Sequence, residues 1–388
     1  MIPKEGQPGE WRVDVDLRAV NQRSVKHHHR MPDILSCWDR LAKARRLSVI
    51  DLTKSYYQFP IADDGSREKT AFWAAGSLWE YTVCPMGFVN SGAHFQQRIE
   101  AKLRAGGVLN TSCVRVTQGD KPDHTPLKLP SGAEPTELGP DDGTSPYLDD
   151  LILFSGDGGD PNATDLVLND CHDGVCRKVL DCLCVNDLYC HAKKCHWFCT
   201  LVRFVGAIAG NGILAMDPAK VSAIDAWNRP TTGTEIRSFL GMANFYRRFV
   251  KGFADIAAPL TNLLKKGTNV RAMWTDECTT AFDSLRGHMQ SYPILRLPDF
   301  SKPFFIVTDA MKGAVGGALM QLHDGKLHPV AYYSKRLTPK QCEWPVRELE
   351  CYGIVCTVEH FESYLLGSPF TFIRTTTSRS SGSRPRAS

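Results

Sequence analysis

The sequence predicts an α+β fold with two or three domains, and three observations support this. The chain has 388 residues, which is long enough for more than one hydrophobic core. Short apolar runs at residues 47–50 and 151–154 border acidic residues and have the length typical of strands. Between residues 236 and 246, apolar side chains recur at three- and four-residue spacing, which predicts a helix.

Composition excludes some classes of protein. Hydrophobic residues make up 43% of the chain and charged residues 23%, as in ordinary globular proteins. The formal charge of +4 does not identify a nucleic-acid binder, so any basic surface must be local. No stretch has transmembrane length and no apolar signal core begins the chain. We therefore expect an intracellular protein that is not secreted, with no membrane partner and with reduced cysteines.

The first half of the chain predicts a strand, a helix and an irregular segment. Residues 11–17 alternate large apolar and charged side chains, as a half-buried strand does, and residues 93–103 place Phe95, Ile99 and Leu103 on one helix face. From residue 117 to Pro146, six prolines argue against a regular element. This segment is either a tolerated surface insertion or a damaged one, and the sequence leaves both alternatives open.

Two adjacent carboxylates, Asp149 and Asp150, directly precede the apolar run 151–154. Neighbouring Asp residues repel and strands are depleted in Asp, so a bound cation would explain the pair. Asp51 follows the apolar run 47–50, and three carboxylates at the ends of neighbouring strands could hold two divalent ions for phosphoryl transfer. The alternative is that the Asp pair simply caps a turn.

The second half predicts helices and then a mixed α/β segment. A helix is predicted over about 165–185, and residues 217–290 read as helical. Residues 303–375 show apolar strands, then a helix near 343–366, then a short strand at 370–373. The polar stretch 376–388 cannot bury a core, and we expect it to be disordered.

Six segments resemble, in the same order, the motifs of one polymerase family. Residues 48–58, 69–72, 85–96 and 147–150 resemble palm motifs of reverse transcriptases. Residues 239–249 resemble the thumb of Gypsy-class LTR retrotransposon polymerases, and residues 304–310 resemble the opening strand of their RNase H domain. Because these matches span most of the sequence, the chain resembles the reverse transcriptase–RNase H region of a Gypsy-class pol polyprotein.

The resemblance implies a right-hand polymerase of fingers, palm and thumb, followed by a partial RNase H-like α/β domain. It assigns residues 1–216 to fingers and palm, with an irregular insertion at about 104–146. The thumb and connection helices would occupy 217–298 and the RNase H-like domain 299–375. The family has more chain at both ends, so we expect an N-terminally truncated polymerase with an incomplete RNase H domain.

For polymerisation, the resemblance assigns Asp51 and Asp149 as bridging metal ligands, with Asp150 in support and the Leu52 carbonyl facing the nucleotide metal. Mg²⁺ suits such hard oxygen ligands, with Mn²⁺ as the alternative ion. The same resemblance gives Lys194 the role of general acid toward the departing pyrophosphate. The expected partners are dNTPs and an RNA or DNA template with its primer.

Substrate contacts are also implied by the resemblance. Arg12 matches a triphosphate-contacting arginine, Tyr56 the aromatic that disfavours a ribose 2′-hydroxyl, and Met86 a residue of the substrate-side motif. Core packing is the alternative for Tyr56, and a surface charge is the alternative for Arg12. Phe204 and Gly206 fall in a segment similar to the primer-grip hairpin.

Basic side chains near the thumb helix, Arg247 and Arg248 among them, match positions that contact template–primer phosphates. The alternative for these charges is a solvated helix face. The resemblance implies a location in a cytoplasmic particle or the nucleus. It does not fix the oligomeric state.

For RNA cleavage, the family needs four acidic residues around two metal ions. Asp309 matches the first and Glu350 the second, with Glu348 as its competitor. Thr376 stands where the third acidic residue belongs, and the fourth would lie beyond this chain. We therefore expect no RNase H activity, and a catalytically inactive element remnant that at most binds nucleic acid remains the alternative function.

Seven cysteines crowd the segment 171–199, with three histidines among them. A zinc site is one interpretation, but no C-x-x-C pair occurs and the spacing does not supply paired ligands. Burial of these thiols as small hydrophobic groups is the other interpretation.

Overall fold

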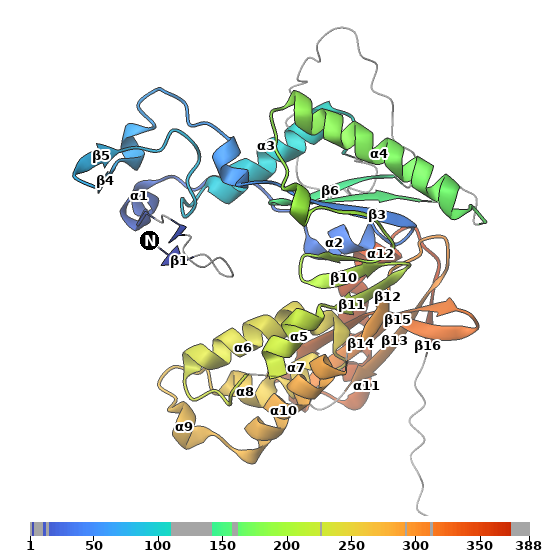
Figure 1. The fold of residues 1–388 in the computed structure, drawn as a ribbon. Coiled ribbons are helices and arrows are strands. Elements are labelled where there is room, and N and C mark those ends of the chain that lie inside the picture. Colours follow the sequence, from blue (N-terminus) through green and yellow to red (C-terminus); the bar gives the residue numbers. More distant parts are fainter. Residues whose placement is uncertain are drawn as a thin grey trace, which may run out of the picture. The chain divides into compact units, whose positions relative to one another are not determined.

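The computed structural model describes residues 2–3, 11–12, 15–109, 142–156, 162–225, 227–291, 293–310 and 313–373 (Figure 1). The chain divides into two compact units. The first comprises Met1–Val205 with Ala209–Asn211, and the second comprises Gly206–Ile208 with Gly212–Ser388. The predicted tail at 376–388, Thr376 and most of the irregular segment lie outside the described residues.

The first unit is built on a four-stranded antiparallel sheet with strand order β6-β7-β3-β8. Its strands are β6 (Gly143–Tyr147), β7 (Asp150–Ser155), β3 (Arg46–Asp51) and β8 (His196–Cys199). Helices α3 (Ser91–Ala105) and α4 (Asp165–Val185) cover one face of this sheet (Figure 1). The predicted helix 165–185 is therefore confirmed, and the predicted helix 93–103 lies within α3.

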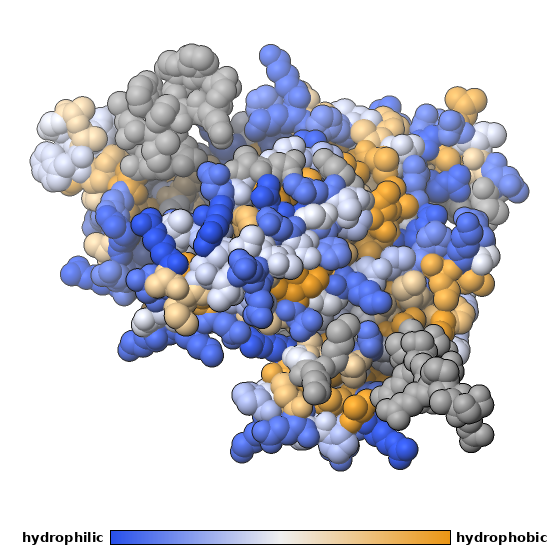
Figure 2. Space-filling view, turned by 90° about the horizontal axis from the view of Figure 1, so that it is seen from below, coloured by the Kyte–Doolittle hydropathy of each residue, from blue (hydrophilic) through white to orange (hydrophobic). Residues whose placement is uncertain are grey.

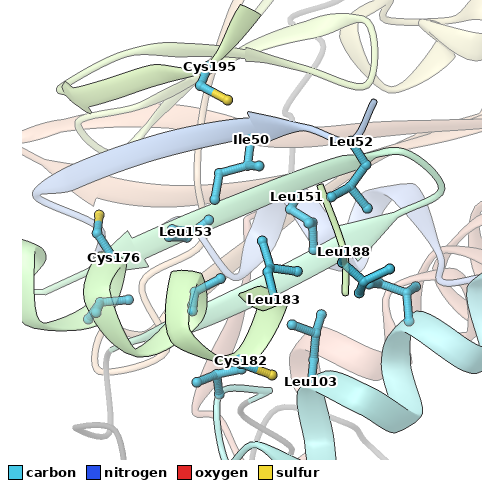
Figure 3. Close-up of a cluster of buried hydrophobic side chains, with 14 of the residues drawn as sticks. Ile50, Leu52, Leu103, Leu151, Leu153, Cys176, Cys182, Leu183, Leu188 and Cys195 are labelled. Atoms are coloured by element: carbon cyan, nitrogen blue, oxygen red, sulfur yellow. The ribbon is translucent and has the colours of Figure 1, made fainter. Parts of the chain in front are cut away.

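A continuous apolar cluster holds α3 and α4 on the sheet (Figure 3). Ile50, Leu151 and Leu153 contribute from the central strands, while Leu103 and Leu183 contribute from the two helices. All five are at most 2% exposed, and burying each such side chain is worth roughly 1.5–3 kcal/mol. The core therefore lies directly beneath the strands that carry the acidic residues.

The remaining elements of the first unit are short. They are β1 (Ile2–Pro3), β2 (Trp11–Arg12), α1 (Arg18–Arg23), α2 (Ile34–Asp39), β4 (Phe72–Ala74), β5 (Ser77–Trp79) and the 3-10 turns η1 (Ser55–Gln58), η2 (Glu68–Thr70) and η3 (Ala192–Lys194). Asp33 caps α2 by accepting a hydrogen bond of 3.0 Å from the Ser36 amide. Of the strand predicted over residues 11–17, the described residues include β2, which pairs with β1, whereas the described residues 15–17 are not in a strand.

The boundary between the units falls within a small sheet with strand order β12-β11-β10-β9. Its strands are β9 (Val202–Phe204), β10 (Ala207–Gly210), β11 (Ile213–Met216) and β12 (Ile294–Arg296). The boundary lies a few residues before the limit of 216 expected from the sequence.

Helices dominate the first part of the second unit. They are α5 (Pro218–Asp225), α6 (Gly233–Phe245), the 3-10 turn η4 (Arg247–Phe249), α7 (Phe253–Ile256), α8 (Ala258–Asn262), α9 (Val270–Met273) and α10 (Asp276–Gln290). The rings of Phe239 on α6 and Phe282 on α10 lie 4.6 Å apart at their centroids, and both are buried. The Thr232 hydroxyl caps α6 by accepting from the Glu235 amide at 3.2 Å.

The second unit also contains a four-stranded sheet with order β15-β14-β13-β16, in which β16 runs parallel to β13. The strands are β13 (Phe304–Ala310), β14 (Ala314–His323), β15 (Lys326–Arg336) and β16 (Phe370–Ile373). The helix predicted near 343–366 is divided into the 3-10 turn η5 (Gln341–Glu343) and helices α11 (Val346–His360) and α12 (Glu362–Leu365). A Cβ on Gly317 would lie 2.3 Å from Thr357, so glycine at this position lets α11 approach β14 closely.

Hydrophilic side chains cover much of the face shown in Figure 2, with hydrophobic areas between them. Within the described ranges, no helix is both long enough and apolar enough to span a bilayer.

His172 on α4 joins the helix to both central strands of the first sheet. Its Nε2 lies 2.8 Å from the Ser48 hydroxyl on β3, and its Nδ1 lies 2.9 Å from the Ser155 hydroxyl on β7. The imidazole is fully buried. Burial, aided by the nearby Arg46 charge, lowers the pKa of His172 to about 4.

We predict that acid destabilises the first unit through His172. Folding lowers its pKa from 6.5 to about 4, so the unfolded chain takes up this proton first as the pH falls. The associated stabilisation is complete above pH 6.5 and is lost toward pH 4, by about 3 kcal/mol. The free energy of unfolding, measured by urea denaturation across this range, should depend less on pH in His172→Gln than in the parent chain.

The matched control is His196→Gln, because His196 is exposed on β8. This control should keep the pH dependence of the parent chain. The same pH dependence in the parent and in His172→Gln would contradict the prediction.

Candidate active site

Strand register brings the predicted acidic residues to one edge of the first sheet. Asp51 is the last residue of β3 and pairs directly with Asp150, the first residue of β7. Asp149 lies in the turn between β6 and β7, and its carbonyl accepts a hydrogen bond of 3.1 Å from the Leu52 amide. The antiparallel ladder therefore places Leu52 and all three carboxylates at the same end of two adjacent strands.

Electrostatic repulsion within this group is visible at Asp150. Burial, followed by the charges of Asp149 and Asp51, raises the pKa of Asp150 to about 6, while Lys194 acts in the opposite direction. The Lys194 Nζ lies 3.6 Å from Asp51 Oδ2. Because the Lys194 side chain is 62% exposed, this ion pair contributes less than about 1 kcal/mol.

Carboxylate oxygens of this kind are the ligands that Mg²⁺ prefers, so the chemistry of the donors fits a divalent cation. In the described part of the chain, no three His, Cys, Asp or Glu side chains converge in a ready-made metal-binding group. Mutual repulsion of carboxylates opposes closer convergence unless a cation neutralises them.

A buried glutamine holds the turn that carries Asp149. The Leu148 amide donates to Gln96 Oε1 at 2.8 Å, and Gln96 Nε2 donates to the Pro146 carbonyl at 3.1 Å and to Glu100 Oε1 at 2.8 Å. Leu148 has a φ of 53°, in the left-handed region that costs a non-glycine residue about 1–2 kcal/mol. Gln96 is fully buried, so its hydrogen bonds clamp this turn in place.

The role of Gln96 was not predicted from the sequence, although a signal was present. Gln96 precedes Ile99 and Leu103 by three and seven residues, so it lies on the apolar stripe of a helix. A polar side chain on such a stripe must find buried partners.

Tyr56 lies beside the acidic group, on the turn η1 after β3. Its ring packs edge-on against Phe95 with centroids 5.3 Å apart. A Cβ built on Gly92 would lie 3.8 Å from the Tyr56 hydroxyl and 3.9 Å from Leu148 Cδ2, so Gly92 leaves room at this position. Burial, and then the charge of Asp149, raises the pKa of the Tyr56 phenol.

The loop after α4 forms another side of the site. Gln58 Nε2 donates to the Tyr189 carbonyl at 2.9 Å, and Gln58 Oε1 accepts from the Tyr189 amide at 2.8 Å. The His191 amide donates to the Asp51 carbonyl at 2.8 Å. These contacts tie the loop that carries Lys194 to the end of β3.

Met86 lies in the segment that precedes α3 and is partly buried. Next to this segment is a cavity of about 440 Å³ with a largely apolar lining. The lining includes Tyr56, Phe59, Pro85, Phe88 and Phe95. Arg12 falls in β2, and its side chain lies outside the described residues.

The structure does not support phosphate contacts by Arg247 and Arg248. Arg248 is only 4% exposed, and its Nη2 donates to the Val330 carbonyl at 3.1 Å. Arg247 Nη2 donates to the Ser334 carbonyl at 2.7 Å. Our expectation treated both as surface charges, but their guanidinium groups bond strand β15 within the second unit.

Phe204 and Gly206 make contacts within their own units. The Phe204 side chain is buried, and its carbonyl accepts from Trp38 Nε1 at 3.1 Å. Gly206 has a φ of 74°, and its carbonyl accepts from the Tyr246 hydroxyl at 2.7 Å. A side-chain contact from Phe204 to nucleic acid is therefore incompatible with this structure. Gly206 has no side chain and could make such a contact only through its backbone.

The predicted RNase H residues lie on β13 and α11. Asp309 and Glu350 are both exposed, as is the competitor Glu348. A Cβ on Gly353 of α11 would lie 4.0 Å from the Asp309 carbonyl, so the helix crosses close to this end of β13. Their catalytic roles stay a prediction.

The cysteines of segment 171–199 occupy different environments. Cys176, Cys182 and Cys195 are buried in the apolar cluster of the first unit. Cys171 and Cys184 are exposed, and Cys190 and Cys199 are partly buried.

Comparisons with known proteins agree with this architecture. Residues 2–242 match the family described as reverse transcriptase (RNA-dependent DNA polymerase), and residues 274–372 match the RNase H-like domain found in reverse transcriptase. Two solved structures of foamy viral protease-reverse transcriptase, one with double-stranded DNA and one with an RNA/DNA hybrid, share the fold. The first has a TM-score of 0.74 at 22% identity, covering 96% of this chain and 57% of that one. The second has a TM-score of 0.67 at 22% identity, covering 95% of this chain and 44% of that one.

Curated relatives are longer proteins. The chain is 30% identical over 377 residues to the retrovirus-related Pol polyprotein from transposon 412 of Drosophila melanogaster, covering 96% of this chain and 26% of the relative. It is 29% identical over 374 residues to the retrovirus-related Pol polyprotein from transposon gypsy of the same organism, covering 94% of this chain and 31% of the relative. The predicted fold class and the predicted resemblance are confirmed, and this chain belongs to the reverse transcriptase (RNA-dependent DNA polymerase) family, with similarity to retrotransposon Pol polyproteins.

Proposed function

We propose that this chain is an RNA-directed DNA polymerase that extends a primer by two-metal nucleotidyl transfer. The observation that carries the proposal is the register pair between Asp51 and Asp150, with Asp149 in the adjoining turn. Family membership supplies the reaction class, and the chain spans roughly a quarter to a third of its curated relatives. The activity is therefore proposed as one part of a longer Pol polyprotein, in a cytoplasmic particle or the nucleus.

Asp51 and Asp149 would hold two Mg²⁺ ions, with Asp150 and the Leu52 carbonyl in support. Bound ions of this kind activate the primer hydroxyl and neutralise charge on the departing pyrophosphate. The register pair of Asp51 and Asp150 supports the assignment, because crowded carboxylates are stabilised by a cation. Lys194, held near Asp51 and more than half exposed, is placed to donate a proton to pyrophosphate.

The nucleotide would lie against Tyr56, whose ring is fixed by Phe95. A ribose 2′-hydroxyl would meet this ring, so Tyr56 would favour dNTPs. Met86 and Arg12 are proposed to contact the base and the triphosphate. The partners are dNTPs and a primed RNA or DNA template, as the nucleic-acid complexes of the foamy viral enzymes suggest by fold likeness.

The RNase H-like region is proposed to be inactive in this chain. Asp309 and Glu350 match the first two acidic residues of such a metal site, whereas Thr376 stands at the position of the third. A primer-extension assay on a labelled RNA template reads both activities at once. The length of the primer reports DNA synthesis, and the length of the labelled template reports RNA cleavage. An inactive element remnant would bind the primed template without extending it.

We predict that Asp149→Asn lowers DNA synthesis by at least about 100-fold, because charge stabilisation of the transition state is lost. Primer extension with Mg²⁺ measures the effect. The matched control is Asp173→Asn on α4, an Asp that pairs with Arg177 away from the site. Comparable extension by Asp149→Asn and the parent chain would refute the metal-ligand assignment.

We predict that Tyr56→Val narrows the preference for dNTPs over rNTPs by about 10- to 100-fold, because the ring no longer excludes the 2′-hydroxyl. Single-nucleotide incorporation kinetics with dNTP and rNTP give the ratio. Tyr56→Phe keeps the ring and should keep the preference. A ratio unchanged in Tyr56→Val would leave Tyr56 as a core-packing residue.

We predict that Gln96→Met disorders the turn that carries Asp149. Methionine has a similar size but cannot replace the hydrogen bonds to the Leu148 amide and the Pro146 carbonyl. Turnover should fall by about tenfold or more, and half-maximal synthesis should need more Mg²⁺. Gln97→Met on the exposed side of the same helix is the control.

The Mg²⁺ requirement separates positioning of the turn from a general loss of stability. If Gln96→Met lowered the melting temperature but left both turnover and the Mg²⁺ requirement of the folded protein unchanged, the positioning role would be excluded.

A further inference from the structure

A cavity of about 440 Å³ lies in the first unit, next to the candidate active site. It shares the side chain of Tyr56 with that site, whereas Met86 and the three carboxylates are not among the described residues that line it. Its volume falls within the range of roughly 300–1,000 Å³ that is typical of small-molecule sites. The cavity is therefore large enough to take a ligand of its own.

Aromatic rings form much of the lining. Phe59 and Phe95 pack edge-to-face with ring centroids 5.3 Å apart, and the Tyr56 ring packs edge-on against Phe95 at 5.3 Å. Phe88 and Pro85 add further apolar surface. Because aromatic pairs prefer edge-to-face or offset-stacked arrangements, such walls favour a flat aromatic ring as the occupant.

Hydroxyl groups on the lining already have partners within the protein. The Ser24 hydroxyl donates to the Val20 carbonyl at 2.8 Å. The Thr70 hydroxyl donates to the Arg67 carbonyl at 2.6 Å and accepts from the Tyr81 amide at 2.9 Å. The polar edges of a nucleobase would lose hydrogen bonds to water in such a place, whereas a hydrocarbon ring has none to lose.

Hydrogen bonds fasten the α1 side of the cavity to the segment that precedes α3. Asn21 Nδ2 donates to the Gly87 carbonyl at 2.8 Å, and Asn21 Oδ1 accepts from the Val89 amide at 2.8 Å. Asn90, which is 8% exposed, accepts from the His27 amide at 2.9 Å. The cavity is thus preformed, which reduces the ordering cost of binding a ligand.

Positive charge lies beside the aromatic lining. Lys69 and Arg98 line the cavity with exposed side chains, and no Asp or Glu is among its described lining residues. The Arg98 guanidinium carbon lies 5.8 Å from the centroid of the buried Phe59 ring. An anionic group on the occupant could therefore form a charge-assisted hydrogen bond with this guanidinium.

We propose that this cavity is a binding site for a small aromatic carboxylate, with the ring of the ligand among Phe59, Phe88 and Phe95 and its carboxylate at Arg98. The aromatic walls select the flat apolar body, and the unbalanced positive charge selects the acid group. The binding site itself does not depend on the proposed polymerase function.

An occupant would also brace Tyr56. The Tyr56 ring is partly buried and borders the cavity, so the cavity gives the ring room to move away from a ribose 2′-hydroxyl. An aromatic ligand would fill that room, and a clash with the 2′-hydroxyl could no longer be relieved. Occupancy should therefore raise the preference for dNTPs, a consequence that rests on the proposed function.

The test uses 2-naphthoate as the probe and the Cys84 thiol, which lines the cavity, as the reporter. The full chain is treated with N-ethylmaleimide for increasing times, with and without the probe, and is then digested with trypsin. The peptide 70–98 contains Cys84 and no other cysteine, so mass spectrometry gives the labelling rate of this thiol. At a probe concentration tenfold above its Kd, labelling should slow about tenfold, while labelling of the exposed Cys171 should not change.

Variants separate the charge from the apolar lining. Arg98→Gln, whose reporter peptide is 70–102, should bind 2-naphthoate about threefold or more weakly and the uncharged 2-naphthamide as the parent does. The matched control is Arg104→Gln, which removes a charge from the same helix outside the cavity and should bind both probes as the parent does. Val20→Phe, which adds volume to the lining, should bind both probes about tenfold more weakly.

Single-nucleotide incorporation tests the bracing of Tyr56. Saturating 2-naphthoate should raise the ratio of dNTP to rNTP incorporation by about threefold or more in the parent chain. A ratio that stays unchanged at saturating probe would exclude the bracing.

Equal labelling of Cys84 with and without 2-naphthoate would overturn the binding site. Equal affinity of the parent chain for 2-naphthoate and 2-naphthamide would overturn the preference for an anion. Displacement of 2-naphthoate by dATP would show that the cavity belongs to the nucleotide site and would overturn the proposal as well. A parent chain that makes no DNA would instead refute the polymerase function, while protection of Cys84 would still establish the binding site.

Discussion

The register between β3 and β7 is the constraint on which the rest of the first unit depends. The pairing runs from Arg46 opposite Ser155 to Asp51 opposite Asp150. A slip of one residue would turn Ile50, Leu151 and Leu153 away from the helices and would separate the carboxylates. Because the apolar run before Asp51 and the one after Asp150 are both fully buried, core formation itself aligns the acidic residues. The repulsion among these carboxylates is thus imposed by the same packing that stabilises the sheet.

Three polar side chains connect the sheet to the surrounding elements, and of these Gln96 and His172 are buried while Gln58 is partly buried. Gln96 fixes the turn at Leu148 from α3, Gln58 fixes the loop at Tyr189 from η1, and His172 joins α4 to β3 and β7. Each of these groups would destabilise the fold if it were buried without partners. Because their partners are mostly backbone groups or strand hydroxyls, losing one should disturb position more than packing. The loop that carries Lys194 is positioned in this way, although Lys194 itself is mostly exposed.

The sequence allowed the strands next to Asp51 and Asp150 and the helix 165–185 to be predicted, because their signals are local. An apolar run beside a carboxylate and a helical spacing of apolar residues do not depend on distant partners. The hydrogen bonds of Gln96 could not be derived from it, since they depend on how the chain folds back in three dimensions. Gln96 could be recognised in the sequence as a polar residue on an apolar stripe, whereas the cysteines of segment 171–199 could not be told apart from buried small hydrophobic residues.

Arg248 shows why charge alone misled the prediction. Its position after α6 gives the pattern of a basic surface helix, and nothing nearby in the sequence reveals that β15 passes over it. The structure instead uses Arg247 and Arg248 to bond the Ser334 and Val330 carbonyls of β15. The helical segment and the RNase H-like sheet belong to one compact unit, and these two arginines supply part of the bonding between them. A buried guanidinium that pairs with a strand carbonyl, as that of Arg248 does, serves the fold and is not a surface charge.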